Sequence, residues 1–254
     1  MDLFEHKFEE QKKQDLPLAT RMRPNRLDDF VGQRHLVGEG RVLRKAIESG
    51  QLPSFILWGP PGSGKTTLAF IIAHATKSFF SPVSAVNAGV SDLRQVVGKA
   101  KERRKLYQQK TILFIDEIHR FNKAQQDAVL PFVEDGTVTL IGATTENPSF
   151  EVISPLLSRC RVLTLNPLLV DDIRVIILRA LSDTLDGIGN LKVMLNDDAM
   201  LHLIMMSNND ARVALNALET AVLTTPSDAK GKRHLSLDII EDVFQKRAHA
   251  SITT

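Results

Sequence analysis

A glycine-rich segment, GPPGSGKT, runs from Gly59 to Thr66 and matches the pattern G-x-x-x-x-G-K-[ST]. Glycines let backbone N–H groups turn inward around a polyphosphate, and a helix that begins at the end of such a loop adds the positive end of its dipole. The lysine amine then reaches the β- and γ-phosphates, and the final hydroxyl coordinates Mg²⁺. The spacing therefore predicts an ATP and Mg²⁺ site centred on Lys65 and Thr66. We expect the nucleotide to contact Gly59, Pro60, Pro61, Gly62, Ser63, Gly64, Lys65, Thr66 and Thr67.

Two adjacent carboxylates, Asp116 and Glu117, end the apolar run in TILFIDEIHRF. Ligands gather at the carboxyl ends of the strands in a parallel sheet, which is also where the glycine-rich loop belongs. We expect Asp116 to hold Mg²⁺ through its water shell and Glu117 to polarise the attacking water. A surface Asp-Glu pair at a strand end is the competing interpretation. The glycine-rich loop, one strand and one helix earlier in the chain, favours the catalytic one.

Four apolar runs must position these groups, and a helix-like segment follows each of the first three. The runs cover residues 55–59, 79–86, 111–118 and 137–145, and the helices are expected at about 65–75, 90–106 and 123–133. Strands that are apolar almost throughout and alternate with helices indicate a parallel sheet covered on both faces. Residues 161–168 are a candidate fifth strand. The pattern predicts an α/β fold with a three-layer αβα core.

After Pro167 the spacing becomes helical and strand candidates become scarce. Helical periodicity marks residues 171–185, 196–207, 209–224 and 236–248. This pattern predicts a small all-helical second domain. We therefore divide the chain into a mobile tail over 1–15, a P-loop core over 16–168 and a helical domain over 169–254.

The composition sets limits on the environment of the protein. Its 254 residues are 43% hydrophobic and 24% charged, which is typical of a globular protein, and no apolar stretch is long enough to span a bilayer. The charged segment after Met1 lacks the apolar stretch of a signal peptide. Cys160 is the single cysteine, which excludes an intramolecular disulfide and fits a reducing compartment. We expect a cytoplasmic protein, associated with the nucleoid in a bacterium. The formal charge of +2 does not by itself indicate a nucleic-acid binder.

The order of the motifs resembles that of an AAA+ ATPase. GPPGSGKT is followed by IDEIHRF, IGATTENPSF, LLSRC and NDARVALN. More narrowly, the segments RMRPNRLDDFVGQRHL, ILWGPPGSGKTTLA and DEIHRFNKAQQDAVLPFVEDGTVTLIGATTENPSFE are similar to the replication-associated recombination protein A family, which includes Werner-helicase-interacting protein. The likeness covers about residues 16–248. It implies a P-loop AAA+ core followed by a helical lid.

The resemblance also implies roles for individual residues. Thr145 would be the sensor-1 group between the carboxylates and the γ-phosphate. Arg159 would be the arginine finger, presented to the ATP of a neighbouring subunit, and Arg212 would be the sensor-2 residue of the lid. Asn87 would be the polar switch that restrains Glu117. The segment that resembles the adenine-pocket wall contains Arg23, Pro24, Val31 and Gly32.

Each of these positions also has a purely structural interpretation. Thr145 and Asn87 could satisfy turns at strand ends, and Arg159 and Arg212 could form surface ion pairs. The planar, permanently charged arginine fork nevertheless suits charge that develops on the γ-phosphoryl group. One position departs from the family pattern, because Asn209 stands where a glycine usually precedes Asp-Ala-Arg. Asn tolerates a left-handed backbone better than most residues, so the turn can be kept.

The densest basic run, KAKERRKLYQQK, covers residues 99–110. A helix there would place Lys101, Arg104 and Lys105 on neighbouring faces. A solvated helix surface explains the same run, and no stacking platform of interleaved aromatic residues is visible. DNA binding is therefore implied mainly by the resemblance.

The resemblance implies a DNA-stimulated ATPase that acts in replication-fork maintenance and in recombination and repair. Expected partners are single-stranded, gapped or forked DNA and replication proteins such as single-stranded-DNA-binding protein, and members of the family form homo-oligomers. Three other functions stay open: a clamp-loader subunit, a Holliday-junction branch-migration motor, and an ATP-dependent scaffold that does not hydrolyse. Family members continue past residue 254 into a helical region that builds tetramers. This chain stops soon after the lid, which raises the expectation of a fragment without that oligomerisation region.

Overall fold

The computed structural model describes residues 15–85 and 88–252, without the side chains of 246–252. The chain forms two compact units. One is Pro24–Pro167, and the other combines the described residues before Pro24 with those from Leu168 onward. Each unit has its own hydrophobic core. Within the described residues, no helix is long and apolar enough to cross a membrane.

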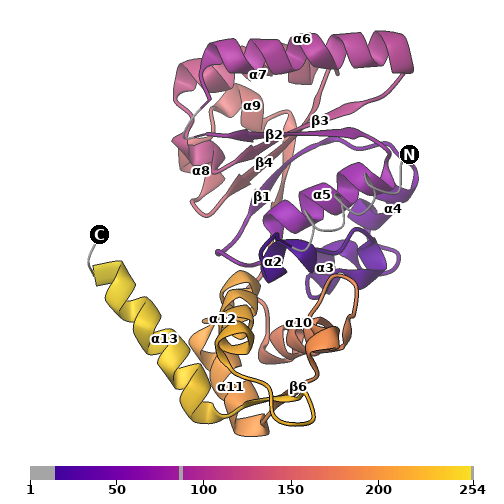
Figure 1. Ribbon diagram of the computed structural model, residues 1–254. Coiled ribbons are helices and arrows are strands. Elements are labelled where there is room, and N and C mark those ends of the chain that lie inside the picture. The colour runs from indigo at the N-terminus through magenta and orange to yellow at the C-terminus, as the bar shows by residue number, and fades with distance from the viewer. Residues whose placement is uncertain (1–14, 86–87, 253–254) are drawn as a thin grey trace. The chain divides into compact units, whose positions relative to one another are not determined.

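The first unit is built on a five-stranded parallel sheet (Figure 1). The strand order is β2-β3-β4-β1-β5. Four of these strands match the predicted apolar runs, and the candidate fifth strand is also present. Their bounds are β1 Ser54–Trp58, β2 Phe79–Ser84, β3 Thr111–Asp116, β4 Thr139–Thr144 and β5 Cys160–Thr164.

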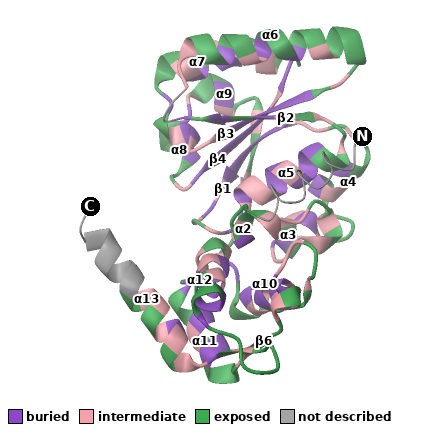
Figure 2. Ribbon diagram, in the orientation of Figure 1, coloured by how far each residue is buried: buried purple, intermediate pink, exposed green. Residues whose placement is uncertain are grey.

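Helices cover both faces of this sheet, so the predicted three-layer αβα core is confirmed (Figure 1). Successive strand residues point to opposite faces. On β1, Phe55 and Leu57 pack with the helices α4 and α5, whereas Ile56 packs with α6, α7 and α9. Figure 2 shows the three inner strands, β1, β3 and β4, as mostly buried between the two helical layers. The helices of this unit are α3 Arg34–Val37, α4 Val42–Glu48, α5 Lys65–Ala75, α6 Val90–Tyr107, α7 Lys123–Glu134, α8 Pro148–Glu151 and α9 Ser154–Leu157. Two short 3₁₀ turns, η1 Leu27–Asp29 and η2 Ile118–Arg120, complete it.

Local chemistry explains where the main helices begin. Helix α5 starts directly after Gly64, whose φ of 96° ends the glycine-rich loop. Helix α7 starts with a capping box, because the Asn122 side chain accepts from the Gln125 amide and the Gln125 side chain accepts from the Asn122 amide. These reciprocal bonds satisfy two backbone N–H groups that the helix leaves without partners.

The second unit is a helical domain. Its core gathers buried apolar residues from α10 Val170–Ser182, α11 Asp197–Met206, α12 Ala211–Thr224 and α13 Leu237–Ile252. A small parallel pair of strands, β6 Val193–Leu195 and β7 Arg233–Leu235, and the 3₁₀ turn η3 Gly189–Leu191 are also present. The prediction of an all-helical domain therefore needs a correction. Strands of three residues are too short to produce a recognisable alternation in the sequence.

The beginning of the chain also differs from the predicted division. Helix α2, Leu18–Arg21, was expected in the ATPase core but belongs to the helical unit. Leu18 is fully buried in the core of that unit, and its backbone N–H lies 3.0 Å from both carboxylate oxygens of Glu219. Arg21 pairs with the same carboxylate at 3.3 Å. The predicted mobile tail over 1–15 lies, apart from Asp15, outside the described residues.

Candidate nucleotide-binding and hydrolysis site

The ends of three neighbouring strands bring the predicted site together. Strand β4 lies between β1 and β3, with Trp58 of β1 paired to Thr144 and Ile115 of β3 paired to Gly142. The glycine-rich loop follows Trp58, and the Gly59 amide donates to the Thr144 carbonyl at 3.2 Å. Because adjacent strands are about 4.8 Å apart, the loop and the acidic pair begin about 10 Å apart, on either side of the end of β4.

The glycines of the loop are required by its conformation. Gly62 and Gly64 have φ values of 70° and 96°, which L side chains adopt only with strain. A Cβ on Gly64 would also lie 2.9 Å from the ring of Phe30, and one on Gly59 would lie 2.5 Å from the Leu165 carbonyl oxygen. The backbone of the loop therefore passes too close to its neighbours for any side chain at these two positions.

The polar groups inside the loop fit a polyphosphate. Lys65 is buried, and its Nζ donates to the carbonyls of Gly59 at 2.7 Å and Pro60 at 2.8 Å. Among the described residues, the buried Ser63 hydroxyl oxygen has no hydrogen-bond partner. An ammonium and a hydroxyl enclosed at a helix N-terminus suit an anion. Thr66 and Thr67 follow in the first turn of α5, where Thr66 would reach a metal ion bound to the phosphates.

The metal ion would have to share its ligands with the nucleotide. No cluster of three or more His, Cys, Asp or Glu side chains that could hold a metal occurs in the described residues. Mg²⁺ is typically bound by one or two protein ligands together with phosphate oxygens and water. The half-buried Asp116, at the end of β3, and Thr66 are a donor set of this kind.

Glu117 directly follows β3 and is held in an uncommon conformation. Its φ is 55°, in the left-handed region, which costs a non-glycine residue about 1–2 kcal/mol. Its carboxylate Oε2 lies 3.2 Å from Nε2 of His119. The other ring nitrogen of His119, Nδ1, lies 2.9 Å from the hydroxyl of Thr144. His119 belongs to the IDEIHRF motif, but no pattern in the sequence indicated a role for it or for Thr144.

The end of β4 contains two threonines with different surroundings. Thr144 is fully buried, and its hydroxyl accepts from the Glu146 amide at 3.0 Å as well as contacting His119. Thr145, the predicted sensor, is the next residue and is half-buried. It follows the strand that separates the loop from the acidic pair, as its predicted role requires.

A glutamine that no sequence motif singles out connects the predicted adenine-wall segment to the loop. Gln33 is buried with a φ of 54°, and its side-chain amide donates to the carbonyls of Ser63 at 3.2 Å and Asn166 at 2.7 Å. Its Oε1 accepts from the Asn166 amide at 2.9 Å. The half-buried Val31 and Gly32 directly precede Gln33 in the chain. The hydrogen bond from the Gln33 side chain to the Ser63 carbonyl therefore links their segment to the glycine-rich loop. Pro24 is also half-buried and starts the same unit.

Arg159, the predicted finger, lies on the surface of the first unit and is held by its own chain. Its Nε lies 2.5 Å from Oε1 of Glu134. Its Nη1 donates to the Pro155 carbonyl at 2.8 Å and lies 3.0 Å from the Ser158 hydroxyl. The neighbouring Cys160 is partly buried, and burial raises the pKa of its thiol to about 12. A thiol with so high a pKa is unreactive near neutral pH, as expected of a residue that only packs.

The remaining predicted residues belong to the helical unit or lie outside the description. Arg23 and Arg212 are in the helical unit, and Arg212 is exposed in the first turn of α12. Asp210 caps that helix by accepting from the amides of Arg212 and Val213. Asn209 has a φ of 62°, so it does adopt the left-handed backbone that we expected at this position. Asn87 falls outside the described residues.

The basic run on α6 is largely occupied in packing. The Arg103 guanidinium lies 3.5 Å from the centre of the Phe79 ring, and the Lys101 amine lies 5.1 Å from that of Phe132. Arg104 donates to the Gly136 carbonyl at 2.6 Å. These contacts give the run a structural purpose that does not require DNA.

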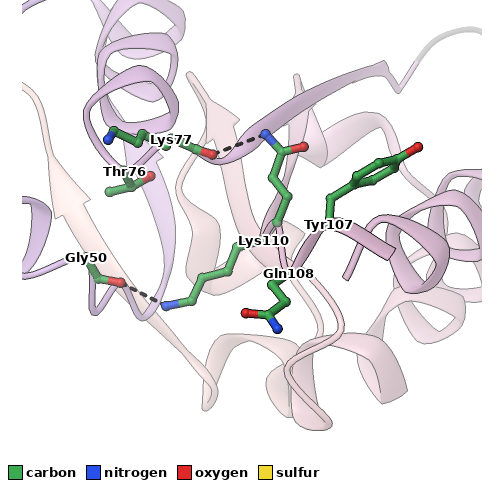
Figure 3. A pocket seen from close by; sticks show the side chains of 7 residues that line it. Gly50, Thr76, Lys77, Tyr107, Gln108 and Lys110 are labelled. Carbon is green, nitrogen blue, oxygen red and sulfur yellow. Dashed lines mark hydrogen bonds between the residues drawn. The ribbon is translucent and has the colours of Figure 1, made fainter. Parts of the chain in front are cut away.

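A separate cavity lies at the opposite edge of the sheet, where β2 and β3 begin (Figure 3). Two hydrogen bonds link residues that line it: Lys110 donates to the Gly50 carbonyl, and Gln109 donates to the Lys77 carbonyl (Figure 3). Neither the glycine-rich loop nor the acidic pair lines this cavity. The candidate nucleotide site is the one at the carboxyl ends of the strands.

Comparisons with known proteins identify the family of the chain. Residues 22–154 match the model of the Holliday junction DNA helicase RuvB P-loop domain, and residues 189–251 match that of an AAA C-terminal domain. The chain is 47% identical over 232 residues to replication-associated recombination protein A of Escherichia coli K12, covering 91% of this chain and 52% of the relative. It is 42% identical to ATPase WRNIP1 of Dictyostelium discoideum, covering 91% of this chain and 27% of that one.

A solved structure of the Thermotoga maritima RuvB Holliday junction branch migration motor matches with a TM-score of 0.69 and 30% identity, over 89% of this chain and 72% of that one. The chain spans about half the length of the recombination protein A of E. coli. The two family models and these relatives thus agree with the P-loop αβα core and the helical C-terminal region. The chain belongs to the AAA+ P-loop ATPases, in the family of replication-associated recombination protein A and WRNIP1.

Proposed function

We propose that this chain binds and hydrolyses MgATP, and that DNA stimulates its turnover during replication-fork maintenance and recombination. The observation that supports the proposal is the strand order, in which the glycine-rich loop starts beside the end of β4 and the acidic pair ends the strand on the other side of β4. The names of the relatives support the link to replication and recombination. We also propose the cytoplasm as the location, and the nucleoid in a bacterium.

The residues divide the chemistry between them. Lys65 and the loop amides hold the phosphates, while Thr66 and Asp116 hold Mg²⁺, which neutralises charge on the β- and γ-phosphates. Glu117 accepts a proton from the attacking water, and Thr145 contacts the γ-phosphate. The nucleotide is further bound by the adenine-wall segment and by Arg212 of the lid. Asn87 restrains Glu117.

Two substitutions test the ATPase assignment. Lys65→Ala abolishes nucleotide binding, because the loop loses its only buried cation. Glu117→Gln keeps the shape and the metal site but cannot accept a proton, so it binds ATP and does not turn over. Binding of a fluorescent ATP analogue and phosphate release measure the two effects separately. Unchanged hydrolysis by Glu117→Gln would remove the assigned base.

DNA and oligomerisation are tested by the stimulation of turnover. Phosphate release is measured with single-stranded, gapped and forked DNA, with and without single-stranded-DNA-binding protein, over a range of chain concentrations. If Arg159 acts in trans, turnover per chain rises with concentration, and Arg159→Ala abolishes that rise. Brisk hydrolysis that does not depend on concentration would contradict the trans assignment.

A branch-migration motor is the second candidate, because the first unit matches the RuvB P-loop domain and a RuvB structure. This candidate predicts that the chain converts four-way junctions to duplex products in an ATP-dependent gel assay. Fork-specific stimulation without junction conversion favours the first proposal.

A further inference from the structure

We propose that His119 is a positioning residue that links the catalytic base Glu117 to the end of β4 and, through it, to the phosphate loop. The proposal rests on the assignment of Glu117 as the base. His119 is a residue of η2, and 15% of its side chain is exposed. Its two ring nitrogens contact two different polar groups of the site, Glu117 on one side and Thr144 on the other.

The chemistry of the partners sets the direction of these hydrogen bonds. An ionised carboxylate can only accept, so Nε2 of His119 carries the hydrogen that Glu117 Oε2 accepts. In a neutral ring Nδ1 then has a lone pair, and the Thr144 hydroxyl donates to it at 2.9 Å. The alternative acceptor for that hydroxyl, the Glu146 carbonyl, is more distant at 3.3 Å. The resulting chain runs from the Thr144 hydroxyl through the imidazole to the carboxylate.

The same threonine is also bonded to the phosphate loop. The Gly59 amide donates to the Thr144 carbonyl, so a continuous path connects the first residue of the loop with Glu117. Thr144 is fully buried in the central strand of the site. An anchor of this kind holds the imidazole in one orientation, as the orienting partner of a base does in other hydrolases.

Glu117 needs such a support more than an ordinary strand residue does. It is the first residue beyond β3, its backbone has a left-handed φ of 55°, and its side chain is 37% exposed. Without a partner, a partly exposed glutamate would populate several rotamers. A base acts efficiently only when it is held within hydrogen-bond reach of its water. His119 supplies the missing constraint, so its loss lowers kcat without weakening ATP binding.

Three substitutions at His119 separate its two contacts. His119→Gln can still donate to Glu117, as Nε2 does. His119→Asn is too short for Glu117 and retains only the Thr144 contact, and His119→Ala loses both. We expect kcat to fall roughly 10²-fold in His119→Ala and His119→Asn, the size of effect seen when a reacting group is misplaced by about 1 Å. His119→Gln retains most of the activity. In all three variants the KM for ATP stays within twofold of the parent value, and the thermal midpoint stays within a few degrees of it.

Double variants test whether the residues act as one unit. In a Glu117→Gln background, His119→Ala has no further effect on the residual rate. Thr144→Val, which removes the hydroxyl while keeping the volume, lowers kcat by a smaller factor, and combining it with His119→Ala adds nothing. His74→Ala, on the exposed end of α5, is the control and leaves kcat unchanged.

The outcomes distinguish this inference from the assignment on which it rests. If Glu117→Gln still turns over, the assignment of the base fails. If Glu117→Gln stops turnover but the Asn and Gln variants of His119 have the same kcat, only the positioning role is overturned. A rise of kcat in His119→Ala or His119→Asn would also overturn it, because His119 would then restrain the base instead of holding it in place.

Discussion

Glu134, the last residue of α7, binds the side chain of Arg159, with Oε1 and Nε 2.5 Å apart. The same guanidinium also reaches the Pro155 carbonyl and the Ser158 hydroxyl of its own segment. Arg159 is therefore folded back on its own unit. A finger that serves the ATP of another subunit must first leave these contacts.

The energy of this ion pair predicts a measurable effect. Both side chains are about 40% exposed, and such pairs are worth about 0.2–1 kcal/mol. Glu134→Gln should therefore raise the concentration-dependent part of ATP turnover by at most about fivefold, which corresponds to the upper end of that range. Turnover at high dilution stays the same. Asp127→Asn, an exposed substitution on the same helix, is the matched control, and a fall in turnover with Glu134→Gln would show that the pair positions the finger instead of restraining it.

Alanine substitutions at two glycines separate the effect of backbone strain on stability from the effect of damage to the glycine-rich loop on ATP binding. Gly64 and Gly40 both have positive φ values, 96° and 76°, so Ala at either position costs about 1–2 kcal/mol. A Cβ on Gly64 would meet the Phe30 ring at 2.9 Å, whereas one on Gly40 meets nothing within 4 Å. Both variants should lower the thermal midpoint, but only Gly64→Ala should also weaken ATP-analogue binding, by tenfold or more. Equal binding by the two variants would contradict the role of Gly64.

The thiol of Cys160 should be protected in the folded chain. Burial raises its pKa from the ordinary 9.0 to about 12, so the fold favours the neutral thiol. At pH 8 the thiolate fraction is lowered about a thousandfold, since the pKa differs by about 3, and labelling with a disulfide reagent slows accordingly. The contribution of this pKa difference to the free energy of unfolding is fully present below pH 9. It is lost as the pH rises from 9 through about 12. Rapid labelling of the folded chain at pH 8 would contradict this, with the guanidinium-unfolded chain as the reference.

Arg103 should affect stability more than DNA binding. Its guanidinium lies over the Phe79 ring at 3.5 Å, a contact worth about 0.5–2 kcal/mol. Arg103→Ala should lower the free energy of unfolding by this amount, whereas the exposed Lys105→Ala should change it by less than about 0.5 kcal/mol. Chemical denaturation measures both. If α6 does bind DNA, Lys105→Ala lowers DNA affinity without changing stability.

The sequence by itself determined the parts of the protein that are continuous in the chain. The loop from Gly59 to Thr66, the pair Asp116 and Glu117, and the helix bounds of α5 are local patterns, because turn geometry, hydrophobic periodicity and helix starts depend on neighbouring residues. Short sequence motifs, which are also local patterns, identified the AAA+ class. The three-layer core followed from apolar strands alternating with helices.

Only the tertiary structure decided which distant residues meet. The insertion of β4 between β1 and β3 places Thr144 against both Gly59 and His119, and no local pattern specifies strand order. The same is true of Gln33 behind the loop, and of Leu18, which joins Glu219 across 201 residues of sequence. Such contacts depend on how whole elements pack, a property of the complete fold that residue types and spacing do not contain.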